Sequence, residues 1–165
     1  MMLLLLLLAC PPGSLPIHVP AAGPPVCGSW QDLQAYSRTP GPAPEITLPD
    51  GGIRVEDGAW VITRATVQTT LRAGLGALAR QARLDEVWAG GRIVGFRVVG
   101  LPTHSPFRRL GIQSGDVLRS VNGLDLTNPL HMLGLFALLQ SPNPSVSLKI
   151  SRGKQDVLLV WRVEG

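Results

Sequence analysis

The sequence predicts an α+β fold, a small sandwich or partly open barrel with two unequal helices, preceded by an extra helix and a disordered proline-rich linker. Ten of the 15 prolines lie between Pro11 and Pro49. Proline fixes φ and lacks an N–H donor, so this part of the chain is unsuited to helix or sheet interiors. After it, short β-branched runs alternate with two helical patterns. Strands on both sides of unequal helices indicate one small domain with a single core.

The composition divides the chain into three parts. Residues 1–9 form an apolar, signal-like segment, residues 10–59 the disordered Pro/Gly-rich linker, and residues 60–165 the folded domain. Residues 1–59 hold two arginines and five acidic residues, whereas residues 60–165 hold 13 Lys/Arg and six acidic residues. The basic residues of the domain are scattered, without runs or interleaved aromatic residues, which argues against nucleic-acid binding.

The N-terminus carries six leucines, Leu3 to Leu8, followed by Ala9 and Cys10. This run is much shorter than the roughly 20 residues that a membrane-spanning helix needs. The leucines and the proline-rich sequence after them indicate an export signal. The segment Leu7-Leu8-Ala9-Cys10 also resembles the lipobox of bacterial lipoproteins, in which the cysteine thiol takes a diacylglycerol anchor. That resemblance implies lipidation of Cys10 and a periplasmic, membrane-anchored protein; the alternative is a signal peptide that is cleaved and lost.

The residue types that hold metals or perform catalysis do not form a recognisable site. Cys27 is the only other cysteine, and the histidines His18, His104 and His131 have no ligand spacing. The G-x-S-x-G elbow, H-E-x-x-H and phosphate-loop motifs are absent from the sequence. We expect no catalytic residue, no metal and no cofactor.

The domain is expected to begin with a helix over residues 63–83. Thr63 is a suitable N-cap, and apolar residues then follow on one helical face: Val67, Leu71, Leu75 and Leu78. Gly74 and Gly76 weaken this helix by about 1 kcal/mol each relative to alanine.

The middle of the domain consists of short elements. β-Branched and aromatic residues predict the strands, and Ser105-Pro106 supplies a cap and a first helical residue. The tight turn at Asn122-Gly123 favours positive φ. In order, we expect a strand at 86–88, a turn at 90–91, a strand at 93–99, a helix from 105 to Gly111 and a strand at 116–121.

The last part of the domain is predicted to be a helix followed by a hairpin. Asn128-Pro129 begins a helix over residues 130–140, and the Ser-Pro-Asn-Pro sequence at 141–144 ends it. Val146, Leu148 and Ile150 alternate with polar residues, and residues 157–163 form the return strand.

Two groups of motifs resemble known families. Residues 110–118 (L-G-I-Q-S-G-D-V-L) and 120–123 (S-V-N-G) resemble the L-G-L-x-x-G-D-x-I-x-x-V-N-G block of bacterial PDZ domains. Gly115 suits the turn before the strand, and Asp116 caps it. Further segments resemble the C-terminal region of type II secretion system protein C: 61–71, 81–83, 95–98, 105–107 and 122–126.

The resemblance implies a non-catalytic PDZ domain in the periplasm that binds secretion-system components or exported substrates. We expect the transmembrane helix and secretin-binding domain of that family not to carry over to this chain. The alternative is a stand-alone PDZ adaptor or regulator of a periplasmic protease.

The PDZ resemblance also implies a peptide site. In such domains a partner's C-terminus adds as a strand, and backbone N–H groups of a turn hold its carboxylate. The helix over 130–140 would form the second wall, although its apolar residues equally fit ordinary core, and a lone histidine equally fits the surface. The candidate residues are Val94, Gly95 and Phe96 at the turn, Arg97 and Val98 along the edge, and His131, Met132, Leu135 and Phe136 on the helix.

Overall fold

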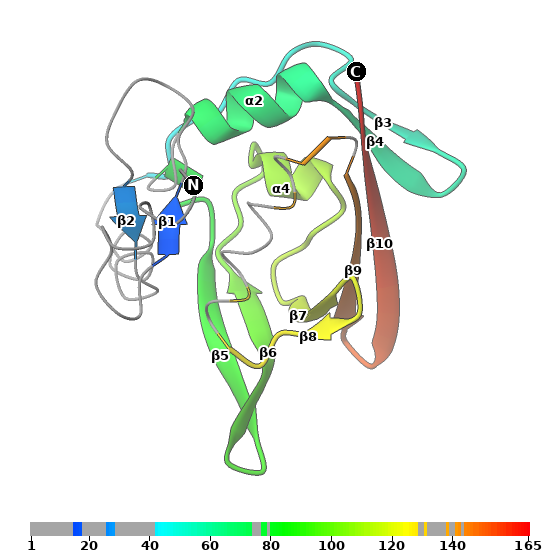
Figure 1. The fold of residues 1–165 in the computed structure, drawn as a ribbon. Coiled ribbons are helices and arrows are strands. Elements are labelled where there is room, and N and C mark those ends of the chain that lie inside the picture. The colour runs from blue at the N-terminus through cyan, green and yellow to red at the C-terminus, as the bar shows by residue number, and fades with distance from the viewer. Residues whose placement is uncertain are drawn as a thin grey trace, which may run out of the picture.

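The domain is built on one open sheet (Figure 1). The computed structural model describes residues 42–73, 77–78, 80–128, 131, 138, 141–142 and 144–165, together with the backbone of 15–17 and 26–28. Its eight-stranded sheet has the order β3-β4-β10-β9-β7-β6-β5, with β8 paired to β7. Two helices, α2 and α4, accompany the sheet in the described residues. The predicted α+β domain with an open sheet is confirmed.

The elements of the main sheet have the following bounds: β3 Ile53–Glu56, β4 Ala59–Thr63, α2 Arg64–Arg72, β5 Arg83–Ala89, β6 Arg92–Val99, α4 Pro106–Arg109, β7 Val117–Val121, β8 Leu124–Asp125, β9 Ser145–Arg152 and β10 Gln155–Glu164. A separate pair, β1 Leu15–Ile17 and β2 Val26–Gly28, is antiparallel.

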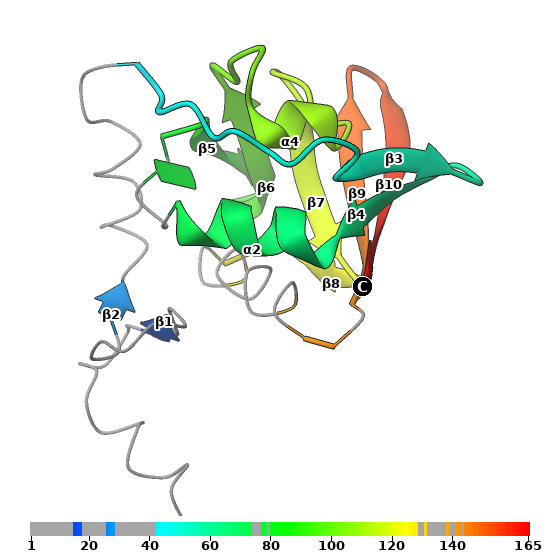
Figure 2. The ribbon, with the colours of Figure 1, turned by 90° about the horizontal axis from the view of Figure 1, so that it is seen from above.

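Strand β10 joins the beginning of the domain to its end. It pairs antiparallel with β9 and parallel with β4, so that Trp161 lies opposite Trp60. The β3–β4 hairpin thereby extends the sheet beyond β10, while β5 closes the opposite end (Figures 1 and 2). Residues of α2 and α4 line one pocket, together with Trp161 of β10.

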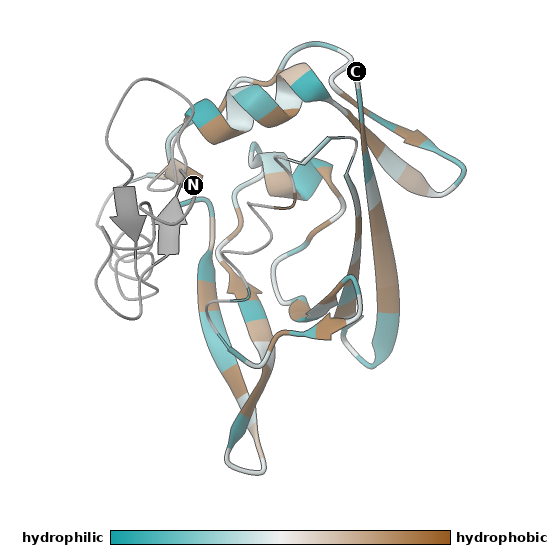
Figure 3. Cartoon of the chain, in the orientation of Figure 1, coloured by the Kyte–Doolittle hydropathy of each residue, from teal (hydrophilic) through white to brown (hydrophobic). Residues whose placement is uncertain are grey.

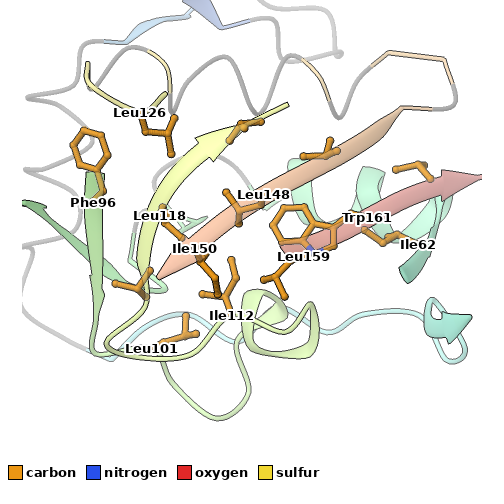
Figure 4. Packing of buried hydrophobic residues seen from close by; sticks show 14 of the residues in the cluster. Ile62, Phe96, Leu101, Ile112, Leu118, Leu126, Leu148, Ile150, Leu159 and Trp161 are labelled. Atoms are coloured by element: carbon orange, nitrogen blue, oxygen red, sulfur yellow. The ribbon is translucent and has the colours of Figure 1, made fainter. Parts of the chain in front are cut away.

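One face of the sheet carries the core. Along β9 and β10 alternate residues are buried. Figure 3 shows that the middle of β10 is largely hydrophobic. Figure 4 shows the buried side chains converging from β6, β7, β9 and β10 and from the chain around α4. The Trp161 indole donates a hydrogen bond from Nε1 to the Leu110 carbonyl at 3.0 Å, which ties β10 to the end of α4.

Helix α2 starts where the sequence indicates and ends earlier. The Thr63 hydroxyl accepts a hydrogen bond from the Thr66 amide at 3.3 Å, so the predicted N-cap is confirmed. The helix ends at Arg72, and Arg83, where it was expected to end, is the first residue of β5. Ala77 and Leu78 are also helical, but the predicted end near Arg83 is too late, because the chain turns at Arg80 and Gln81 and residues 83–89 pair with β6.

The fold begins before residue 60, which corrects the predicted linker boundary. Strand β3 pairs with β4, and Ile46 and Leu48 are buried against Leu78. The Gln81 side chain donates a hydrogen bond to the Pro44 carbonyl at 2.8 Å. Proline residues lack N–H donors but retain carbonyl oxygens, and these can accept hydrogen bonds from a buried amide side chain. Residues 42–59 therefore belong to the domain.

Other predicted features lie mostly outside the described residues. Of the helix expected over 130–140, only His131 and Leu138 are described, and both are helical. Met132, Leu135, Phe136 and the signal-like segment with Cys10 are not among the described residues. None of the helices formed by the described residues has the length and hydrophobicity needed to cross a membrane.

Candidate peptide-binding edge

The turn that was predicted to hold the carboxylate of a partner's C-terminus lies inside strand β6. Phe96 pairs with Glu86 of β5 on one side and with Leu118 of β7 on the other. Arg97 is likewise flanked, by Asp85 and Val117. Since both edges of β6 are occupied here, a partner strand cannot add beside it, and the prediction of a strand-addition site along β6 is wrong.

Gly95 has a structural reason to be glycine. It lies at a β-bulge with φ of 151°, and a Cβ atom there would lie 2.5 Å from the Leu118 carbonyl oxygen. The close approach of β6 to β7 therefore depends on the missing side chain. Beside it, the Val94 carbonyl accepts a hydrogen bond from Arg119 Nη1 at 2.9 Å.

The side chains of β6 divide between core and surface. Phe96 and Val98 are buried in the core, whereas Arg97 is exposed on the other face of the sheet. Phe96 and Val98 therefore contribute to the core, and Arg97 faces the solvent. The structure keeps these candidates together on one strand but away from a free edge.

The free edge at this end of the molecule belongs to β5. Val98 directs both backbone groups at the two residues that precede β7: its N–H donates to the Asp116 carbonyl at 2.8 Å, and its carbonyl accepts from Gly115 at 2.7 Å. Its cross-strand neighbour on β5 is Leu84, so this is a non-hydrogen-bonded pair. Leu84, and Glu86 two residues on, consequently point their N–H and C=O groups away from β6. No strand among the described residues pairs with that edge.

The side chains of the β5 edge combine apolar surface with charge. Leu84 packs against the core, whereas Trp88 is 60% exposed. The Trp88 indole donates from Nε1 to the Glu86 carboxylate at 3.2 Å, which holds the ring beside the edge. Leu84, Glu86 and Trp88 therefore offer an exposed ring, a carboxylate and an aliphatic side chain along one edge.

The sequence contains a pattern that indicates the full length of β5, although the predicted strand was shorter. Residues 84–88 (L-D-E-V-W) alternate apolar and polar residues imperfectly before the Gly90-Gly91 turn, and only 86–88 were assigned to a strand. Residues up to Arg83 were given to the helix instead. A longer hairpin, with its two-residue glycine turn, would have placed the edge correctly.

The described part of the second wall is one histidine. His131 Nδ1 lies 2.9 Å from the Asp125 carbonyl oxygen, within hydrogen-bond distance, and the side chain is half-buried. The ring is thereby connected to β8. The prediction that Met132 and Leu135 form the second wall of a groove concerns residues outside those that the structure describes.

The PDZ-like block forms a buried ion pair. Asp116 is 1% exposed and accepts hydrogen bonds from the Gln113 amide and Arg152 Nε, each at 2.8 Å. Arg152 also donates to the Gly111 carbonyl at 2.7 Å. The hydrogen bonds to Asp116 raise the pKa of the Arg152 guanidinium above its ordinary value. This pair closes the turn between α4 and β7 and joins it to β9.

In the part of the chain that the structure describes, no group of three His, Cys, Asp or Glu residues could hold a metal ion.

Comparisons with known proteins match part of the chain to PDZ domains. The family model of the PDZ domain matches residues 97–152. The PDZ domain of EpsC from Vibrio cholerae, residues 219–305, is 32% identical over 49% of this chain and 92% of that chain, with a TM-score of 0.37. Residues 97–152 therefore match a PDZ domain, a fold that serves protein interaction.

Two further solved PDZ domains are similar. The PDZ domain of the pullulanase C protein of the type II secretion system from Klebsiella pneumoniae, in complex with fatty acid, is 22% identical over 49% of this chain and 82% of that chain, with a TM-score of 0.37. The HtrA3 PDZ domain bound to a phage-derived ligand, FGRWV, is 26% identical over 47% of this chain and 76% of that chain, with a TM-score of 0.37. A search of curated proteins found no match.

Proposed function

We propose that the chain is a non-catalytic periplasmic PDZ protein that binds an extended segment of a protein partner along β5. The observation that carries this proposal is the free edge at Leu84 and Glu86, at the end of the sheet of a PDZ domain. An extended segment adds to such an edge through main-chain hydrogen bonds, and pockets for alternate side chains supply specificity.

The energetics favour a short, selective contact. Each new hydrogen bond to the edge contributes about 0.5–1.5 kcal/mol net. The exposed Trp88 ring is the large apolar surface next to this edge, and buried tryptophan is enriched among residues that dominate binding energy. We expect bound segments to place an apolar side chain against it.

Hydrogen exchange tests the location of this contact. A phage-displayed peptide library, presented with free C-termini and also internally, would supply the probe peptide. On binding it, the amides of Leu84 and Glu86 should become protected, while those of Ile53 and Val55 at the other end of the sheet should not change. Protection at neither β5 amide, with peptide bound, would contradict strand addition at β5.

We also propose that the chain acts in, or as an accessory to, type II protein secretion. The resemblance to secretion protein C includes residues 61–71, which precede the residues matched as a PDZ domain. These residues form most of β4 and α2, and β4 pairs with β10 of the same sheet. The resemblance thus extends to a part of the fold outside the PDZ match.

A deletion strain tests this role. Without the chain, proteins exported by the type II pathway should accumulate in the periplasm, and the wild-type chain should restore their release. Normal export, combined with altered turnover of misfolded periplasmic proteins, would contradict this role and favour a stand-alone PDZ adaptor or protease regulator.

Membrane attachment through Cys10 is a separate proposal. It is supported by the lipobox-like sequence at residues 7–10. Mass spectrometry of the chain from its native host should find diacylglycerol on Cys10, and Cys10→Ser should move the chain to the soluble fraction. Cys27→Ser is the matched control and should leave it with the membrane. A membrane-bound Cys10→Ser chain would contradict lipid anchoring.

A further inference from the structure

The opposite end of the sheet, strand β3, also has a free edge. The Thr63 N–H donates to the Gly52 carbonyl at 3.0 Å, so residues 52 and 63 form a hydrogen-bonded pair. Hydrogen-bonded and non-hydrogen-bonded pairs alternate along an antiparallel ladder. The backbone groups of Arg54 and Glu56 therefore face β4, whereas Ile53 and Val55 point their N–H and C=O groups outward. The two-residue turn at Asp57 and Gly58, with φ of 50° and 75°, fits the same register.

The side chains of β3 have a regular order. Val55 is 63% exposed and lies beside Trp60 of β4. Arg54 and Glu56 project from the other face of the strand and form an ion pair with each other, and Arg54 also pairs with Glu164 of β10. An exposed apolar residue therefore stands between one positive and one negative side chain.

We propose that β3 pairs with β3 of a second copy of this chain, antiparallel, around a two-fold axis at Val55. Val55 then lies opposite Val55 of the second copy, and the two residues exchange two backbone hydrogen bonds. Arg54 lies opposite Glu56 of the second copy, and Glu56 opposite its Arg54. Each subunit uses the same surface, which gives a closed dimer with a continuous sheet.

Charge selects this register over its neighbours. Side chains keep their face only if the pairing shifts by two residues at a time. A shift in one direction places Arg54 opposite Arg54, and a shift in the other places Glu56 opposite Glu56. Like charges directly opposite each other destabilise a strand pair, whereas opposite charges contribute roughly 0.2–1 kcal/mol each. The register at Val55 is the one that makes two favourable pairs.

The contact is small, so its strength depends on concentration. Strand β3 has four residues, and stable interfaces bury at least about 1,200 Å² in total. We therefore expect a weak dimer that forms at high protein concentration. A common membrane surface would favour it further through effective concentration.

Exchange of the two charges provides the first test. Analytical ultracentrifugation of the full chain should show dimerisation weakened about tenfold by Arg54→Glu or by Glu56→Arg, since each places like charges opposite each other. In a Glu164→Gln background, which removes the second ion pair of Arg54, the double variant R54E with E56R should dimerise within about threefold of its parent, because both pairs are restored with their signs exchanged. Thermal unfolding of each variant checks that it is folded. Single variants that dimerise normally, or a double variant as weak as the singles, would overturn the proposal.

Cross-linking at the axis provides the second test. In a hydrogen-bonded antiparallel pair the Cα atoms are about 5.5 Å apart, which is within the range that a disulfide spans. In the full chain with Cys10 and Cys27 replaced by serine, Val55→Cys should oxidise rapidly to a disulfide-linked dimer. Leu158→Cys is the matched control, because Leu158 is 60% exposed but lies on β10. Equal rates of dimer formation for the two variants would overturn the two-fold contact at Val55.

Discussion

The two ends of the sheet have the same backbone arrangement and different side chains. At β5, Leu84 and Glu86 direct their backbone groups outward, and at β3, Ile53 and Val55 do so. Strand β5 is seven residues long and lies beside the bulge of β6, whereas β3 is four residues long and carries the Arg54–Glu56 pair. The register that overlaps all of β5 with a second copy places Glu86 opposite itself, whereas β3 has a register in which the charges complement each other.

This difference shows that a free edge alone does not determine its partner. Unpaired N–H and C=O groups are available at both ends, so any strand could satisfy them. The order of charges and the exposed apolar residue decide which strand fits. The predictions below separate the two ends, beginning with the largest effect.

Gly95→Ala should damage the β5 end most. The new Cβ would lie 2.5 Å from the Leu118 carbonyl oxygen, and clash and strain together should cost about 4 kcal/mol. Chemical denaturation measures this loss, and peptide binding should fall with it. Gly153→Ala, where φ is 60° but no atom lies within 4 Å, should cost only about 1 kcal/mol. Equal losses for the two variants would show that β6 does not need the close approach.

Asp116→Ala should affect both ends alike, because its ion pair lies in the middle of the sheet. The variant leaves the Gln113 amide and Arg152 without their buried acceptor. We expect a loss of about 3 kcal/mol in the free energy of unfolding. Gln113→Ala is the control, since only the backbone of Gln113 makes this contact, and its stability should change by less than about 0.5 kcal/mol. A small effect of Asp116→Ala would mean that solvent replaces the pair.

Thr63→Ala should act mainly at the β3 end, where β4 leads into α2. Loss of the hydroxyl that accepts from Thr66 should cost about 1 kcal/mol. Thr63→Ser keeps the hydroxyl and should retain most of the stability in thermal unfolding. If serine were as unstable as alanine, the lost methyl contact rather than the cap would explain the effect.

The smallest effect concerns pH at the hairpin between β9 and β10. Hydrogen bonds from Lys149 and Ser151 lower the pKa of the exposed Asp156 carboxyl below 3.8. A lowered folded-state pKa stabilises the fold above the unfolded pKa, and this contribution disappears as the pH falls through the folded pKa. The stability difference between the original chain and Asp156→Asn should therefore be present at neutral pH and vanish in strong acid. A difference that grew in acid would contradict this sign.

Local signals in the sequence predicted much of the fold. The Thr63 cap, the Asn122-Gly123 turn and the alternation of β9 depend on neighbouring residues, and all three are found as predicted. The PDZ-like block also predicted the turn that Asp116 closes. These features need no knowledge of distant contacts.

Non-local contacts account for what the sequence did not predict. The parallel pairing of β4 with β10 joins residues about one hundred positions apart, as at Trp60 and Trp161. Likewise, Ile46 and Leu48, in a proline-rich segment, are buried against Leu78, about thirty positions later in the chain. The candidate site was misplaced for the same reason, because pairing of β6 with β7 as well as β5 removes the expected edge.

A pair of proline substitutions tests the different roles of the two edges most directly. Glu86→Pro and Val55→Pro each remove an outward N–H without breaking a bond inside the sheet, and edge strands tolerate proline at such positions. Peptide binding and self-association would be measured for both full-length variants. Glu86→Pro should abolish peptide binding and leave the dimer intact, whereas Val55→Pro should abolish the dimer and leave peptide binding intact. Loss of both properties in one folded variant, or of neither in both variants, would contradict the assignment of separate partners to β5 and β3.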